Sequence, residues 1–137
     1  MPKLSDVKLT ALIVGAVVDN LTTLFLMMLL ATALASTGLS QDDVMNRMKS
    51  MSGQLLSLII GLCCTGLGGY VAGRMAKKAE VLHGALVAVI SVILALILGD
   101  RGGISWSDIL GLVAMLPVGM AGGYFAQQRK TGAAPST

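Results

Sequence analysis

Residues 9–35 read LTALIVGAVVDNLTTLFLMMLLATALA, and this long apolar stretch decides the class of the fold. A helix needs about 20 mostly apolar residues to cross a hydrocarbon core about 30 Å thick, so this stretch can span a membrane with some tilt. The sequence Ala33-Leu34-Ala35 resembles a signal-peptide cleavage site. The apolar region of a signal peptide is only about 7–15 residues long, however, and this stretch contains Asp19. We therefore expect a retained membrane span.

Three further apolar stretches follow, and we expect each to form a membrane-spanning helix: residues 53–75, 81–98 and 106–126. Charged residues make up 12% of the chain, whereas an ordinary soluble domain has about 25%. A soluble chain of 137 residues has too little interior to bury four such stretches, so the lipid bilayer must be their solvent. The sequence predicts a single transmembrane domain, all-α, with a four-helix bundle made of two helical hairpins.

The polar segments supply the connections between these helices. Ser40 followed by Asp43 has the form of a capping box, and methionines then recur at helical spacing. We therefore expect a short helix near 41–51, which either lies on the membrane surface or extends the second span. Residues 99–103 have the composition of a turn, and residues 131–137 that of a disordered tail.

Lysine and arginine are distributed unequally between the two sides of the membrane. One side has Lys3, Lys8, Arg74, Lys77, Lys78, Arg129 and Lys130, and the other has Arg47, Lys49 and Arg101. The positive-inside rule then predicts that both termini are cytoplasmic. The net charge of +3 does not indicate a nucleic-acid partner, because these residues flank apolar spans and form no basic stripe with interleaved aromatics.

Small residues predict where the helices touch, because they let two backbones approach closely in lipid. The second span has one at every fourth position: Ser57, Gly61, Thr65, Gly69 and Gly73. We expect Gly84 in the third span and Gly119 and Gly123 in the fourth to have the same role. These seams are typical of packing within one bundle; alternatively, the seam of the fourth span forms a dimer.

The sequence GGYVA at residues 68–72 recurs as GGYFA at residues 122–126. Each copy lies near the end of a predicted span and is followed by positive charge. Two hairpins of the same topology, related by duplication, would explain this repeat.

Asp19 is the main candidate for a functional residue. It lies about 15 Å along the helix from Leu9 at 1.5 Å per residue, which places it close to mid-bilayer. A carboxylate there costs about 2.5–3.5 kcal/mol on insertion scales, so it should face protein or water and have a partner. We expect Arg74 or His83 as that partner. Asp19 is then either a neutral acid bonded to a neighbouring helix or the proton- or cation-coupling group of a small transporter.

Two neighbours add to the polarity of the first span near Asp19. Asn20 follows it directly, and Thr23 lies one helical turn further on. We include both in the intramembrane polar group.

Nothing in the sequence points to catalysis or to a bound cofactor. It has no nucleophile elbow, phosphate-binding loop or zinc-ligand spacing, and it has a single histidine. Cys63 and Cys64 are adjacent in a span and point about 100° apart on a helix, so they are read as packing residues. We expect no enzymatic activity, no cofactor and no metal.

The segment GGYVAGR at 68–74, followed by HGALV at 83–87, resembles a pattern in small bacterial four-helix membrane proteins of uncharacterised function. The resemblance implies four spans and a bacterial inner membrane, and it implies no known activity. We expect a structural or accessory subunit that packs against itself, as a homo-oligomer, or against a larger membrane complex. The alternative is a small oligomeric transporter or channel that uses Asp19.

Overall fold

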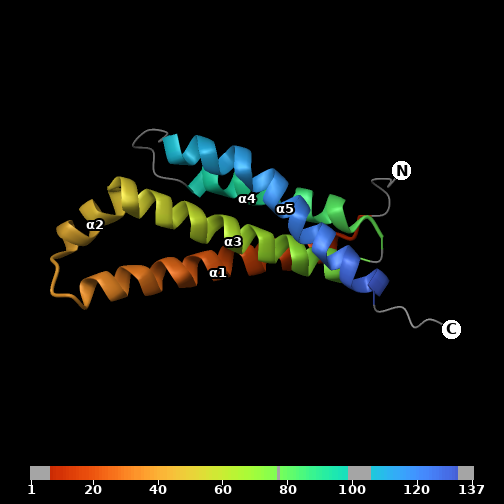
Figure 1. Ribbon diagram of the computed structural model, residues 1–137, viewed down its shortest axis with the longest axis horizontal. Helices are drawn as coiled ribbons and strands as arrows, with labels where there is room; N and C mark the ends of the chain where they lie inside the picture. The colour runs from red at the N-terminus through yellow and green to blue at the C-terminus, as the bar shows by residue number, and fades with distance from the viewer. Residues whose placement is uncertain (1–6, 77, 99–105, 133–137) are drawn as a thin grey trace.

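The computed structural model describes residues 7–76, 78–98 and 106–132 (Figure 1). These residues form five helices and no strand: α1 (Leu9–Ala35), α2 (Gln41–Lys49), α3 (Met51–Met75), α4 (Glu80–Leu98) and α5 (Trp106–Gly132). Helices α1, α3, α4 and α5 are long and apolar enough to cross a membrane. The prediction of an all-α membrane protein with a four-helix bundle is confirmed.

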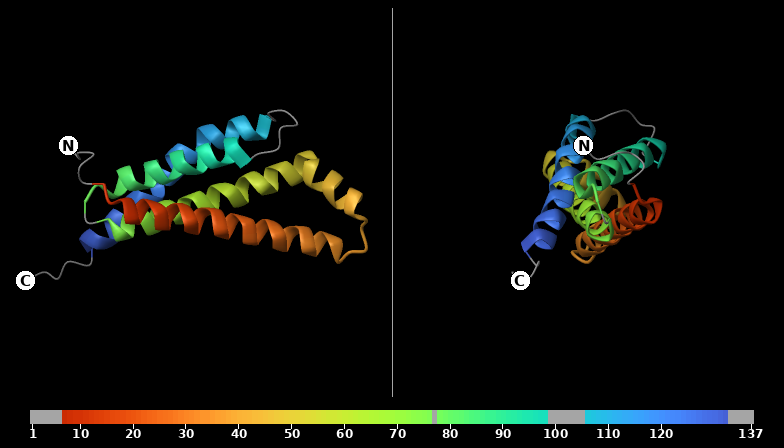
Figure 2. Two further views of the ribbon diagram at one scale, coloured as in Figure 1. Left: turned by 180° about the vertical axis from the view of Figure 1, so that it is seen from behind. Right: turned by 90° about the vertical axis from the view of Figure 1, so that its right-hand side faces the viewer.

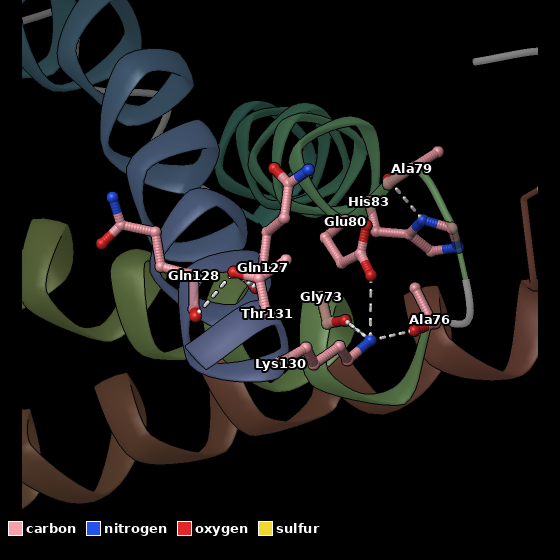
Figure 3. A network of polar contacts seen from close by, with 9 residues as sticks. All are labelled: Gly73, Ala76, Ala79, Glu80, His83, Gln127, Gln128, Lys130 and Thr131. Atoms are coloured by element: carbon pink, nitrogen blue, oxygen red, sulfur yellow. Dashed lines mark hydrogen bonds and ion pairs between the residues drawn. The ribbon is translucent and has the colours of Figure 1, made fainter. Parts of the chain in front are cut away.

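The helix bounds differ from the predicted spans at three places, one of which is the start of α4 at Glu80, one residue before the predicted third span. Helix α3 begins at Met51, two residues before the predicted start of the second span. Helix α5 continues to Gly132, so Thr131 does not begin a disordered tail. The Thr131 hydroxyl donates to the carbonyl oxygens of Gln127 and Gln128 in the preceding turn of the same helix (Figure 3). Residues 133–137 and the predicted turn at 99–103 lie outside the described residues.

The short predicted helix near 41–51 is present as α2. Ser40 begins it, because its side chain accepts a hydrogen bond from the backbone N–H of Asp43 at 3.2 Å. Ser50 ends α2 and also begins α3, since its hydroxyl oxygen accepts from the N–H of Gly53 at 3.3 Å. A single residue therefore separates α2 from α3, and α2 links the end of α1 to the start of α3 (Figure 1).

The start of α1, the connection from α3 to α4 and the end of α5 lie at one end of the molecule (Figure 2). We call this the terminal end and the opposite one the α2 end. Helix α3 is central and contacts α1, α4 and α5. Among the described residues, α1 packs on α3 and α4 but makes no contact with α5.

The buried interior occupies mainly the terminal half of the molecule. The buried residues of α1 are Ala11, Leu12, Gly15, Ala16 and Asp19, and none of residues 20–35 is buried. Residues 51–63 of α3 likewise include no buried residue. Helix α1 diverges from α3 towards the α2 end, so the two form an open fork (Figures 1 and 2), and Asp19 is the last buried residue of α1 before it.

Candidate functional site

Glycine contacts hold the terminal half together. A Cβ atom on Gly69 would lie 2.5 Å from the carbonyl oxygen of Gly119, so α3 and α5 approach backbone to backbone. A Cβ atom on Gly73 would lie 3.1 Å from the Cα of Gly123, and one on Gly84 would collide with Gly119. The structure thus brings these five predicted packing residues together at the contacts of α5 with α3 and α4.

Two of the other three predicted packing residues on α3 lie towards the α2 end. Gly61 has no atom within 4 Å of the position that a Cβ would take, and Ser57 is only half-buried. Both continue the face of α3 on which Thr65 and Gly68 contact α1, because they precede Thr65 by one and two helical turns. This part of the face has no close backbone neighbour, because α1 has diverged from it.

Asp19 sits where α1 crosses α3 at close range. A Cβ atom on Gly68 would lie 2.7 Å from the Cβ of Asp19 and 2.7 Å from the carbonyl oxygen of Gly15. A side chain at residue 68 or 15 would therefore separate the two helices. The Asp19 side chain lies in this crossing, and the residue is 3% exposed.

The Asp19 carboxyl group contacts hydroxyl groups from two other helices. The Thr65 Oγ1 atom of α3 lies 3.4 Å from both carboxyl oxygens, and the Ser91 hydroxyl of α4 donates to Oδ2. The carboxyl therefore links α1 to α3 and α4. Sequence reasoning identified Thr65 only as a packing residue, and it missed Ser91 as a partner.

Equal depth along the helices is the signal that could have identified these partners. Asp19 lies ten residues after the start of α1, Thr65 ten residues before the end of α3, and Ser91 eleven residues after the start of α4. All three of these helix ends lie at the terminal end. At 1.5 Å per residue, the three polar groups therefore fall at the same level, about 15–17 Å from that end.

The two cations predicted as partners of Asp19 lie elsewhere. The Arg74 side chain is exposed at the end of α3. The buried His83 ring binds two other groups: its Nδ1 lies 2.9 Å from the carbonyl oxygen of Ala79, and its Nε2 accepts from the backbone N–H of Lys8 at 2.9 Å. With one nitrogen accepting and the other facing an acceptor, the geometry requires the neutral tautomer that is protonated on Nδ1.

The two polar neighbours on α1 bond within their own helix. The Asn20 side-chain amide donates to the carbonyl oxygen of Ala16 at 2.8 Å, and the Thr23 hydroxyl donates to the backbone carbonyl oxygen of Asp19 at 2.8 Å. They are half-buried at the start of the open fork. The helix backbone thus satisfies these two side chains locally.

A second polar cluster closes the terminal end (Figure 3). The Lys130 ammonium group of α5 donates to the carbonyl oxygens of Gly73, at 2.9 Å, and Ala76, and it pairs with the Glu80 carboxylate at 3.1 Å. Carbonyls at a helix end have no partner within the helix, so Lys130 caps α3 and joins it to the start of α4. Together with the bond from Lys8 to His83, this cluster ties all four long helices at one end.

Within the described ranges, no group of three or more His, Cys, Asp or Glu residues could hold a metal ion. Cys63 is exposed, Cys64 is buried, and both are free thiols. No family model, curated protein or solved structure matches this chain. The features of this chain that bear on function are therefore the open fork and Asp19.

Proposed function

We propose that this integral membrane protein is a non-enzymatic accessory subunit of the bacterial inner membrane. In this proposal it packs against a second copy or a larger membrane complex through the open half of the fork between α1 and α3. The observation that carries the proposal is the absence of any buried residue in positions 20–35 of α1 and 51–63 of α3.

The α3 side of the fork has the composition of a helix-packing surface. Membrane helices associate through close van der Waals contact and interhelical hydrogen bonds, and small residues permit that contact. Gly61 and Ser57 present such a surface, and α1 does not cover it closely. A transmembrane helix from another chain would find there the close approach that α3 makes elsewhere with α1 and α5.

The α1 side of the fork has apolar side chains that a partner helix could contact. Leu26 and Leu30 continue the face of α1 that bears Asp19, and both are half-buried. Leu24 and Met28 lie on the opposite face and are each 69% exposed, as expected for residues that face lipid. A partner helix seated in the fork would contact Leu26 and Leu30 and leave the outer face in lipid.

Purification in a mild detergent tests this function. We expect the tagged wild-type chain to elute as a complex larger than the monomer, and Gly61→Leu to reduce the complex while the monomer remains folded. The matched control is Cys63→Leu, which places the same leucine side chain at an exposed position two residues away on the same helix. A wild-type chain that is monomeric, or a complex that Gly61→Leu leaves unchanged, would contradict the proposal.

Asp19 favours a second candidate function, that of a small oligomeric transporter or channel. It is a buried carboxyl at the level where the packed interior ends and the fork opens. Intramembrane acids mark ion pathways in many membrane proteins. A stable hetero-complex would favour the accessory role, whereas a homo-oligomer with a proton or cation flux that Asp19→Asn abolishes would favour transport.

A further inference from the structure

We propose that Asp19, Thr65 and Ser91 form a proton-binding site that is reached from the α2 end of the molecule. The site does not require ion transport, and its access route belongs to the chain whose fork holds no partner helix. It rests on three features of the structure: the chemistry of the partners, the distance to other charges and the shape of the fork.

Hydroxyl groups are partners that suit both protonation states of a carboxyl group. A hydroxyl can donate one hydrogen bond and accept others, whereas Lys and Arg can only donate. When Asp19 is ionised, Thr65 and Ser91 donate to it. When a proton binds to Oδ2, the new O–H group donates to the Ser91 oxygen, whose own hydrogen turns away. The site can therefore gain or lose a proton without leaving Asp19 unpaired.

No charged side chain near the site would hold Asp19 in its ionised state. Along α3, Arg74 lies nine residues beyond Thr65, or about 14 Å at 1.5 Å per residue, and its side chain is exposed. Along α4, His83 lies eight residues before Ser91, or about 12 Å. Glu80 lies further off still and pairs with Lys130.

Helix α2 also contacts α1, and its charged residues Asp42, Asp43, Arg47 and Lys49 are all exposed at the α2 end; the remaining titratable groups lie on α3. On α3 they are Cys63, Cys64 and Tyr70: Cys64 is buried beside Thr65, Cys63 is exposed, and Tyr70 lies under Arg129 near the terminal end. None of these three groups on α3 supplies a positive charge. An ionised Asp19 is thus an uncompensated charge in the interior, and uptake of a proton removes it.

The fork gives this site one open side. Towards the terminal end, the buried side chains of Leu12, Ala72 and Val87 pack together and separate Asp19 from water. Towards the α2 end, α1 leaves α3, and one turn beyond Thr65 there is open space at Gly61. The access route of this proposal therefore runs on the α2 side of Asp19, past Gly61 and Ser57, and not through the apolar core.

Modification by dicyclohexylcarbodiimide tests the site and its access together. This apolar reagent reacts with a protonated carboxyl group: the acid proton moves to one nitrogen, the carboxyl oxygen bonds to the central carbon, and an acyl shift gives a stable N-acylurea without a leaving group. The full-length protein would be reconstituted in phosphatidylcholine–phosphatidylglycerol vesicles in a known orientation. The pH would be set independently on each side, and the modified residue would be located by mass spectrometry.

We expect Asp19 to be modified, and its rate to fall about tenfold per pH unit above a midpoint when the α2 side is made alkaline. The same change on the terminal side should leave the rate unaltered. The Ser91→Ala variant keeps the Asp19 carboxyl group. Asp19 should therefore still react, but the midpoint pH of its modification should change. Asp43→Asn should match the wild type, because Asp43 is exposed on α2.

Three results would overturn the inference. An Asp19 that remains unmodified at every pH is not a proton-binding site. A modification rate that follows the pH of the terminal side would contradict access from the α2 end. A midpoint pH that Ser91→Ala leaves unchanged would contradict the role of the Ser91 hydroxyl. These outcomes are distinct from a failure of the accessory role, which is measured by complex size.

Discussion

At the scale of single residues, the polar groups of this protein are satisfied by a few specific partners. Asp19 uses hydroxyl groups from two other helices, and His83 uses backbone groups on both sides of its ring. Among the described residues, no buried side-chain nitrogen or oxygen lacks a hydrogen-bond partner. Because an unpaired polar group is costly in a membrane interior, each of these contacts constrains which helices can be neighbours.

A double-mutant cycle measures the contact between Asp19 and Ser91. We expect Ser91→Ala and Asp19→Asn to be coupled by about 0.6–1.7 kcal/mol, which are the average and the maximum found for hydrogen bonds between membrane helices. The measurement is the free energy of unfolding in mixed micelles of a mild detergent and dodecyl sulfate. Thr32→Val is the control, because Thr32 bonds only the carbonyl of Met28 in its own helix; it should show no coupling to Asp19→Asn.

Two glycine substitutions should have opposite effects on stability. A Cβ on Gly84 would meet backbone atoms of Gly119 and Gly123, which cannot move aside as a flexible side chain can. Gly84→Ala should therefore destabilise the fold by at least about 1–3 kcal/mol. Gly61→Ala meets no atom within 4 Å and should be neutral or stabilising by up to about 1 kcal/mol. Equal changes in the free energy of unfolding would show that Gly61 and Gly84 do not differ in how closely other helices approach them.

At the scale of the helices, the two ends of the fork are built differently. The terminal end has glycine contacts, the cap of α3 by Lys130 and the bond from Lys8 to His83. The α2 end is held by short-range contacts such as those of Ser50, which joins α2 to α3. Helices α1 and α3 therefore approach closely at the terminal end and diverge towards the α2 end, where Gly111 of α5 still packs against Leu58 of α3.

Removal of the Lys130 cap should loosen the end of α3. Hydrogen bonds from charged groups contribute about 1.5–3 kcal/mol, so we expect Lys130→Met to lower stability by an amount in this range. Hydrogen exchange should accelerate at residues 70–76 and remain unchanged at residues 56–63. Lys78→Met is the matched control, since the exposed Lys78 side chain lies in the same connection, and it should change stability by less than about 0.5 kcal/mol.

At the scale of the whole molecule, an even number of membrane-spanning helices places both ends of the chain on one side. The structure agrees with this, because the start of α1 and the end of α5 lie at the same end (Figure 2). The distribution of Lys and Arg predicts that this side is cytoplasmic.

Reporter fusions test this orientation. A green fluorescent protein fused after residue 137 should be fluorescent, and alkaline phosphatase at the same place should be inactive. Phosphatase inserted between α1 and α2, at residues 36–40, should be active. The reverse pattern would place the termini outside the cytoplasm and would also reverse the side from which protons reach Asp19.

The sequence by itself determined the elements of this protein. Apolar length predicted four spans, and the capping pattern at Ser40 predicted α2, because both signals are local properties of the chain. Asp19 was predicted to face protein because an acid at that depth cannot face lipid. The spacing of small residues likewise predicted five glycines that the structure places at contacts of α5.

Only the tertiary structure decided which helices meet and where they separate. Ser91 replaces Arg74 and His83 as a partner of Asp19, because α4 packs on α1 at that level while both basic residues lie nearer the terminal end. Gly61 lacks a close neighbour although it has the same spacing as Gly69, because α1 diverges before reaching it. Periodicity defines one face of a helix, but what covers that face depends on helix crossing, which no single segment encodes.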